Sequence, residues 1–218
     1  MLERVLEPEV MDTEQEATEY DRMDHTEANG AFVDRLVALG ARGSMLDIGT
    51  GPGHIPLLVC ERIEGATVLG IDLSQRMLEN AEKHRTGSPW SERISYKHAD
   101  AKNLAFPDEA FDAVFSNTIL HHIPDPLPFL REARRVLRPR GALLIRDLTR
   151  PDSLERLQEL VSLHAAGATP YQRKLFGDSL HAALTLSELS QTAEKAGWKD
   201  AEITVDSDRH ISLQRGAG

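Results

Sequence analysis

Short apolar runs alternate with helical patterns along the first two thirds of the chain. The helical patterns place apolar residues three and four positions apart, as in Met77, Leu78 and Ala81, which follow a capping Ser74. Strands that alternate with helices form a parallel sheet whose two faces are both covered. We therefore expect a doubly wound three-layer α/β sandwich. Its first five strands are predicted at residues 45–48, 67–71, 94–98, 113–116 and 142–147.

The two ends of the chain have less regular patterns. Residues 1–25 are polar and acidic, which is consistent with either a short docking helix or partial disorder. Thr26 caps a predicted helix that Gly40 ends. After Pro151 we expect a helix, then less regular chain to residue 179, then a helix that starts at the capping box Thr185-Leu186-Ser187-Glu188. Two final strands, at 201–205 and 210–214, are spaced for a short hairpin.

A glycine-rich turn and a carboxylate suggest the ligand. The turn Gly49-Thr50-Gly51-Pro52-Gly53 can press against a ligand, because glycine adopts backbone angles that a Cβ atom forbids. Asp72 ends the next strand, where a carboxylate can accept hydrogen bonds from ribose hydroxyls. The dinucleotide fingerprint would need a glycine in place of His54, and Asp47 would repel a pyrophosphate. The pattern thus predicts a nucleoside that carries a positive group, such as an amino acid ammonium.

Four segments match the motifs of a known family in order and spacing. The first is Leu46-Asp47-Ile48-Gly49-Thr50-Gly51-Pro52-Gly53, and the others lie at residues 98–107, 111–117 and 137–145. Over about residues 20 to 150, the chain resembles the class I S-adenosylmethionine-dependent methyltransferases. The resemblance implies a mostly parallel seven-stranded sheet, with the last strand antiparallel beside the fifth, and a small helical cover. The length of 218 residues predicts a single domain. We divide it into an N-terminal helical cap (1–43), a cofactor-binding core (44–150) and a substrate cover with the final strands (151–218).

The resemblance also implies where S-adenosylmethionine is held. Asp47 and Gly49 are assigned to its amino acid end, Asp72 to the ribose, and Asp100 with Ala101 to the adenine edge. Alternatively, Asp72 and Asp100 only cap the turns that follow them. The remaining cofactor contacts are expected at the other turn residues, the adenine faces, the rim of the fourth strand and an N-terminal segment that closes over the cofactor. These are Thr50, Gly51, Gly53, Leu73, Met77, Asn117 and Tyr20.

The acceptor side offers two candidates for catalysis, His122 and Asp147. His121 and His122 follow the fourth strand and resemble a histidine pair of many family members. The alternatives are a loop histidine that only packs the next helix and, at Asp147, a buried turn carboxylate. We expect no metal site, because adjacent residues do not share one face of a regular element. The sequence after Asn117 lacks the Pro-Pro-aromatic signature of methyltransferases that act on nucleobase amines or glutamine, which disfavours those acceptors.

The composition limits the classes of partner and the compartment that we expect for this protein. A formal net charge of -10 opposes non-specific attraction to nucleic acid or to an anionic membrane. No apolar run approaches the ~20 residues of a membrane span, and the N-terminus has no basic-then-apolar signal pattern. Cys60, the single cysteine, excludes an internal disulfide and is expected in the core. We therefore expect a cytoplasmic protein, monomeric or homodimeric.

The sequence predicts an enzyme that transfers a methyl group from S-adenosylmethionine to a small-molecule acceptor by in-line displacement. One alternative is a protein that binds S-adenosylmethionine without using it, as a sensor or a partner of another protein. A second alternative is a nicotinamide-dependent reductase, which the missing glycine and Asp47 disfavour.

Overall fold

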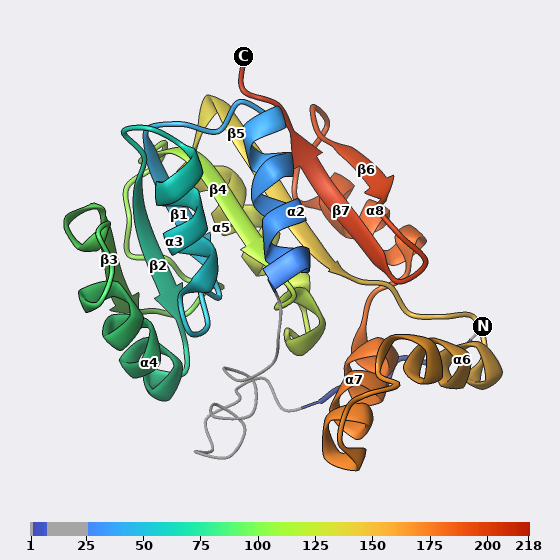
Figure 1. Cartoon of the computed structure of the whole chain (residues 1–218). Helices are drawn as coiled ribbons and strands as arrows, with labels where there is room; N and C mark the ends of the chain where they lie inside the picture. Colours follow the sequence, from blue (N-terminus) through green and yellow to red (C-terminus); the bar gives the residue numbers. More distant parts are fainter. Residues whose placement is uncertain (1, 8–25) are drawn as a thin grey trace.

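A computed structural model describes residues 2–7 and 26–218 of the chain. Its centre is a seven-stranded sheet in the order β3-β2-β1-β4-β5-β7-β6 (Figure 1). In this sheet β7 runs antiparallel to both of its neighbours, and the β1–β5 pairs are parallel. The strands are β1 (Ser44–Ile48), β2 (Thr67–Asp72), β3 (Ile94–His98), β4 (Phe111–Asn117), β5 (Leu137–Leu148), β6 (Glu202–Val205) and β7 (His210–Arg215).

Helices connect the strands and cover the sheet. They are α2 (Thr26–Ala38), α3 (His54–Arg62), α4 (Gln75–Thr86), α5 (Pro126–Val136), α6 (Leu154–His164), α7 (Pro170–Ala182) and α8 (Leu186–Lys195). Two short 3-10 turns are η1 (Ser91–Arg93) and η2 (Leu120–His122). Within the described residues, no helix is long and apolar enough to cross a membrane.

Alternate residues of the central strands point to opposite faces of the sheet, which creates two apolar cores. In β4, Phe115 packs with residues of α2 and α3, such as Phe32 and Val59. The neighbouring Val114 packs on the other face with residues of α5 and α8, such as Phe129 and Leu189. The central strands are therefore buried on both faces, as expected for a parallel sheet between two helical layers.

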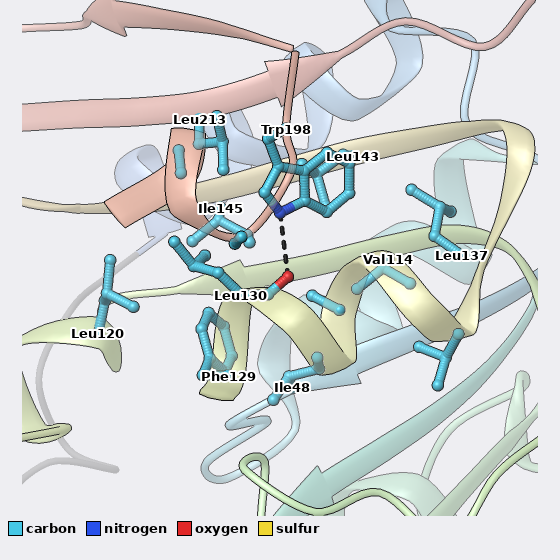
Figure 2. Close-up of a cluster of buried hydrophobic side chains, with 14 of the residues drawn as sticks. Ile48, Val114, Leu120, Phe129, Leu130, Leu137, Leu143, Ile145, Trp198 and Leu213 are labelled. Atoms are coloured by element: carbon cyan, nitrogen blue, oxygen red, sulfur yellow. Dashed lines mark hydrogen bonds between the residues drawn. The ribbon is translucent and has the colours of Figure 1, made fainter. Parts of the chain in front are cut away.

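Trp198 closes the second core at the turn between α8 and β6. Its indole N–H donates to the carbonyl oxygen of Leu130 in α5 at 3.0 Å, and the side chain packs with Leu143, Ile145 and Leu213 (Figure 2). Only 4% of Trp198 is exposed. This single side chain therefore joins a helix on one face of the sheet to the strands β5 and β7.

A third apolar cluster lies between α6, α7 and the end of β5, at one end of the sheet (Figure 1). Leu2 of the N-terminal segment packs against this cluster. The buried Arg150 strengthens the junction, because it donates to the carbonyl oxygens of Leu2 and Ala183 and pairs with Glu188 at 2.6 Å. We call α6 and α7 the helical cover.

The fold confirms the predicted sandwich, the seven strands and the antiparallel last strand beside β5. The prediction for two segments was wrong. β5 begins at Leu137 rather than at residue 142, because Leu137 pairs with Phe111 before a register shift in β4. Residues 170–182 form α7 where less regular chain was expected. The start signal is present in the sequence, since Thr169 and Gln172 form a capping box around Pro170.

Replacing Trp198 by Phe removes a buried hydrogen bond and leaves part of the indole volume empty. We expect the Trp198→Phe protein to lose about 1–3 kcal/mol of unfolding free energy in urea denaturation. Trp90→Phe is the matched control, because Trp90 is partly exposed. We expect this substitution to lower the unfolding free energy by less than half as much as Trp198→Phe does. Equal losses in the two variants would contradict the role given to Trp198.

Candidate active site

A tight turn leads from β1 into α3. The three glycines of Gly49-Thr50-Gly51-Pro52-Gly53 all have positive φ, between 54° and 81°. The backbone N–H groups of Gly49 and Thr50 donate to the carbonyl oxygen of Ile71 at 2.8 and 2.9 Å. A Cβ atom on Gly49 would lie 2.3 Å from Cγ2 of Ile119, so the loop after β4 closes directly on this turn. Only glycine satisfies both the positive φ and this close approach.

Asp72 ties the end of β2 to the same turn. Its Oδ2 accepts a hydrogen bond from the backbone N–H of Gly51 at 2.9 Å, and its Oδ1 accepts one from that of Ser74 at 2.8 Å. Burial raises the pKa of Asp72, and these backbone hydrogen bonds oppose the rise. The backbone N–H of Leu73 also hydrogen-bonds to the carboxylate. Because each carboxylate oxygen offers two acceptor sites, Asp72 keeps the capacity to accept from a further hydroxyl.

A pocket opens over the turn and over the carboxyl ends of β1, β2 and β4. In open α/β sheets, ligands bind beyond the carboxyl ends of the strands, where the strand order reverses. Here that point lies between β1 and β4. Ten of the predicted site residues line the pocket. They are Gly49, Thr50, Gly51, Asp72, Leu73, Met77, Asp100, Ala101, Asn117 and His122.

Asp100 lies at the end of the pocket that follows β3. Its Oδ1 accepts from the backbone N–H of Lys102 at 2.9 Å and pairs with the Lys102 ammonium at 3.0 Å. Burial alone would raise the pKa of Asp100, but these contacts with Lys102 outweigh it and lower the pKa. The carboxylate is therefore ionised at neutral pH and available as a hydrogen-bond acceptor at the pocket wall.

The loop after β4 carries a strained residue against the pocket. Thr118 has φ of 59°, a value that a β-branched side chain rarely adopts. Its neighbour Asn117 is held by Arg146, whose Nε donates to Asn117 Oδ1 at 3.0 Å. Both Asn117 and Thr118 line the pocket. Backbone strain of this kind persists where the surroundings impose it, which is frequent at ligand sites.

Asp47 is buried beneath the glycine turn rather than in the pocket wall. It is 1% exposed and accepts a hydrogen bond from the Thr50 hydroxyl at 2.7 Å. Burial raises the pKa of Asp47 to about 7, the Thr50 hydrogen bond lowers it, and the nearby charge of Asp72 raises it further. A positive group close to the turn would stabilise the ionised form of this carboxylate.

The histidine pair forms a compact cluster with two carboxylates. The rings of His121 and His122 lie 4.2 Å apart in η2. His121 Nδ1 lies 2.6 Å from Asp147 Oδ1, and the backbone N–H of His121 donates to Asp147 Oδ2 at 2.9 Å. Burial alone would lower the pKa of His121, but the carboxylates of Asp147 and Glu7 outweigh it and raise the pKa.

Glu7 reaches this cluster from the N-terminal segment. Its Oε1 lies 3.2 Å from His121 Nε2 and 3.2 Å from His122 Nδ1. The hydroxyl of Ser179, in α7, donates to the same oxygen at 3.2 Å. Glu7 could not be predicted from the sequence, because no local spacing relates it to residues so distant along the chain.

The structure separates the remaining predicted residues. Gly53 caps the start of α3 and would clash with Tyr96 if it carried a Cβ atom, so its role is in the turn. Asp147 is 3% exposed and contacts His121 instead of lining the pocket. Tyr20 lies outside the described residues. The expectation that adjacent histidines point apart assumed a regular element, and it does not hold in the 3-10 turn η2.

Three arginines in and directly after α5 pair with acidic side chains. Arg134 pairs with Asp200 at 3.1 Å, and Arg135 pairs with Glu132 at 2.8 Å. Arg138 pairs with Asp112. These ion pairs reduce the positive charge that this face could present to a nucleic acid.

The fold and this pocket define a nucleoside-binding α/β protein, and comparison with known proteins narrows the class. Residues 46–145 match the family described as "Methyltransferase domain". The chain is 36% identical to the 27-O-demethylrifamycin SV methyltransferase of Amycolatopsis mediterranei, over 56% of this chain and 45% of that protein. It is 30% identical to the demethylmenaquinone methyltransferase of Chlamydia trachomatis, over 75% of this chain and 69% of that protein.

Solved structures agree on the fold. A protein of Methanococcus maripaludis described as an S-adenosyl-L-methionine-dependent methyltransferase superposes with a TM-score of 0.72 at 17% identity. That match covers 100% of this chain and 98% of the other. The chain thus belongs to the class I S-adenosylmethionine-dependent methyltransferase family, as the resemblance of its motifs implied. The match spans less than half the length of the 27-O-demethylrifamycin SV methyltransferase.

The raised pKa of the buried Asp47 predicts that the stability of the folded protein depends on pH. Because its pKa is about 7 in the folded protein against a usual value of 3.8, the folded state binds this proton more tightly than the unfolded chain. Its contribution to stability is therefore fully present below pH ~4 and is lost as the pH rises through about 7. We expect Asp47→Asn to gain stability over wild type between these values, by at most about 4 kcal/mol.

The measurement is urea denaturation of both proteins without ligand, at about pH 5 and about pH 8. The exposed Asp152 supplies the control, and Asp152→Asn should show the same difference from wild type at both pH values. A stability difference for Asp47→Asn that does not grow with pH would show that Asp47 is ionised in the folded protein throughout.

Proposed function

We propose that this protein transfers a methyl group from S-adenosylmethionine to a small-molecule acceptor. One observation carries the proposal: a single pocket joins the glycine turn, Asp72 and Asp100 to His122. The first three features suit a nucleoside, and the histidine lies where a second molecule would meet it. Methyl transfer requires this arrangement, since donor and acceptor must be aligned for in-line displacement.

The cofactor-binding residues follow the order of the pocket wall. Gly49, Thr50 and Gly51 would receive the amino acid end, and the Asp72 carboxylate would accept from the ribose hydroxyls. Leu73 and Met77 would pack on the adenine, with Asp100 and Ala101 at its edge. Gly53 shapes the turn, and Asp47 supplies negative charge below it. We retain Asn117 as a rim contact and Tyr20 as an N-terminal contact on the strength of the family resemblance.

On the acceptor side we assign His122 to direct contact and Asp147 to positioning. His122 lines the pocket, so an acceptor beside the methyl group would touch it, and His122 would assist in removing the acceptor's proton. Asp147 acts through His121, which it holds by two hydrogen bonds. The transferred carbon leaves a sulfonium and joins the acceptor, so a site that excludes water at this point favours the reaction.

Two relatives support a small acceptor. One is named for 27-O-demethylrifamycin SV and the other for demethylmenaquinone. Both names describe organic molecules rather than a nucleic acid or a protein. The net charge of -10 is consistent with such a substrate.

We also propose a cytoplasmic location and a monomeric or homodimeric state. A cysteine that stays reduced suits such a compartment, and Cys60 is a buried free thiol. Burial raises the pKa of the Cys60 thiol, which lowers its reactivity. Light scattering coupled to gel filtration would determine the oligomeric state.

The first test is calorimetric titration with S-adenosylmethionine, S-adenosylhomocysteine and NADH. We expect the two adenosyl ligands to bind and NADH not to bind. Asp72→Ala should weaken the binding of both adenosyl ligands by about 10- to 100-fold, because hydrogen bonds to a charged group contribute about 1.5–3 kcal/mol. Asp152→Ala, at an exposed site, is the control. A folded wild-type protein that binds neither adenosyl ligand would refute the proposed cofactor.

The second test is turnover on a panel of hydroxylated, aminated and quinone-type acceptors, followed by release of S-adenosylhomocysteine. For an accepted substrate we expect His122→Ala to lower kcat by about 100-fold or more, with little change in S-adenosylhomocysteine affinity. His164→Ala is the matched control, since His164 pairs with Asp208 and neither residue lines the pocket. Cofactor binding without turnover of any acceptor would favour a non-catalytic sensor.

A further inference from the structure

The histidine cluster has the composition of a metal site. Glu7, His121 and His122 each offer one ligand atom, and these atoms all lie within 4.8 Å of one another. Two histidines and one glutamate, with a further position open, are a known ligand set of catalytic zinc. The three side chains come from the N-terminal segment and from η2, so the fold itself brings them together.

The distances within the cluster are of two kinds. Asp147 Oδ1 lies 2.6 Å from His121 Nδ1, which is a short hydrogen bond. Glu7 Oε1 lies 3.2 Å from His121 Nε2 and 3.2 Å from His122 Nδ1, at the long limit for a hydrogen bond. Ligand atoms at about 2.0–2.1 Å from a tetrahedral zinc ion are about 3.3 Å apart. The Glu7 distances therefore match two edges of a coordination tetrahedron.

His121 is oriented as a metal ligand is oriented. A metal-binding histidine usually donates the N–H of its other ring nitrogen to a carboxylate, which fixes the tautomer. Asp147 occupies this position at Nδ1, which leaves Nε2, the nitrogen that faces Glu7, as the ring atom that would bind the metal ion. The carboxylate of Asp147 is itself held by the backbone N–H of His121 at 2.9 Å.

Glu7 is placed by several contacts outside the cluster. Arg4 donates to the carbonyl oxygens of His121 and Ile123 at 3.2 and 3.1 Å, which joins the N-terminal segment to the loop of η2. The backbone N–H of Val5 donates to the carbonyl oxygen of His181 at 3.3 Å, and the Ser179 hydroxyl donates to Glu7. These contacts hold the Glu7 carboxylate against the histidines, with 11% of its side chain exposed.

We propose that Glu7, His121 and His122 bind one divalent transition metal ion such as zinc. Two imidazoles and a carboxylate suit zinc, iron or cobalt, whereas magnesium and calcium prefer oxygen ligands alone. Among the described residues these three alone form such a group, and because His122 also lines the cofactor pocket, we place the fourth coordination position on the pocket side.

This inference rests on the proposed function and names the acceptor class: a molecule with a hydroxyl or enol oxygen beside the transferred methyl group. An oxygen bound at the fourth position would lose its proton to water at neutral pH, as metal-bound water does. The new O–C bond then forms while the S–C bond of S-adenosylmethionine breaks. The electron pair of that bond stays on sulfur, which becomes neutral in S-adenosylhomocysteine. His122 would assist deprotonation as a ligand.

The test uses the full chain without an affinity tag, freed of metal with EDTA and dialysed. Zinc chloride is titrated by calorimetry, and cobalt chloride is followed by the visible absorption of four-coordinate cobalt. We expect one equivalent of each ion to bind. Glu7→Gln and His122→Ala should weaken binding by about 100-fold or more, and Asp147→Asn by about 10- to 100-fold.

Matched controls separate this site from adventitious binding. Glu3→Gln changes an exposed glutamate of the same N-terminal segment, and His164→Ala changes a histidine of α6. Both should bind metal as wild type does. Thermal melting and S-adenosylhomocysteine titration of every variant confirm that the fold and the cofactor pocket are intact.

Two outcomes would overturn the inference. One is the absence of saturable zinc or cobalt binding by wild type, and the other is equal binding by wild type, Glu7→Gln and His122→Ala. The cluster would then be a network of hydrogen bonds and ion pairs only. Full turnover of a hydroxylated acceptor by metal-free enzyme would refute the role in deprotonation. The proposed function fails separately, if the metal-free protein does not bind S-adenosylhomocysteine.

Discussion

The hydrogen bonds between the glycine turn and the end of β2 fix the geometry of the whole site. The carbonyl oxygen of Ile71 accepts from Gly49 and Thr50, and the Asp72 carboxylate accepts from Gly51. Together these bonds set the path of the chain into α3 and the floor of the pocket. The loop after β4 then rests on Gly49 through Ile119, and η2 follows from that loop. These contacts therefore fix the start of the loop that carries the histidine pair.

Much of this fold could be predicted from local patterns. The short apolar runs mark strands because the strands of a parallel sheet are buried on both faces, as Val114 and Phe115 illustrate. The glycine turn and Asp72 could be identified because their spacing is set by one βαβ unit. The start of β5 was missed because Leu137 joins the sheet through pairing with Phe111, which no local pattern reports. The start of α7 was overlooked although Thr169 and Gln172 signal it.

The acceptor side was harder to predict for a physical reason. Glu7, Ser179 and Arg150 are brought to η2 and the helical cover by tertiary packing of separate segments. The placement of Asp147 behind His121 also depends on tertiary structure, since β5 and η2 are adjacent only after the sheet has formed. Cofactor binding depends on a continuous unit of the chain, whereas this side depends on remote segments that meet around one turn.

The helical cover is joined to the sheet by fewer apolar contacts than the helices that pack in the two cores. Both cores include residues of the central strands, which pair along their length. The cover cluster instead contacts the sheet through Leu148 at the end of β5, together with the contacts of Arg150. Local opening requires less free energy where fewer apolar contacts must be broken. We therefore expect local opening of the helical cover to require less free energy than opening of either core.

The contact between Gly49 and Ile119 limits how such a protein can diversify during evolution. A Cβ atom at position 49 would displace Ile119 and, with it, the start of η2. A larger side chain at position 119 would press on the turn in the same way. Lineages that acquire new acceptors are therefore expected to vary α6, α7 and the N-terminal segment, where substitutions leave this contact untouched.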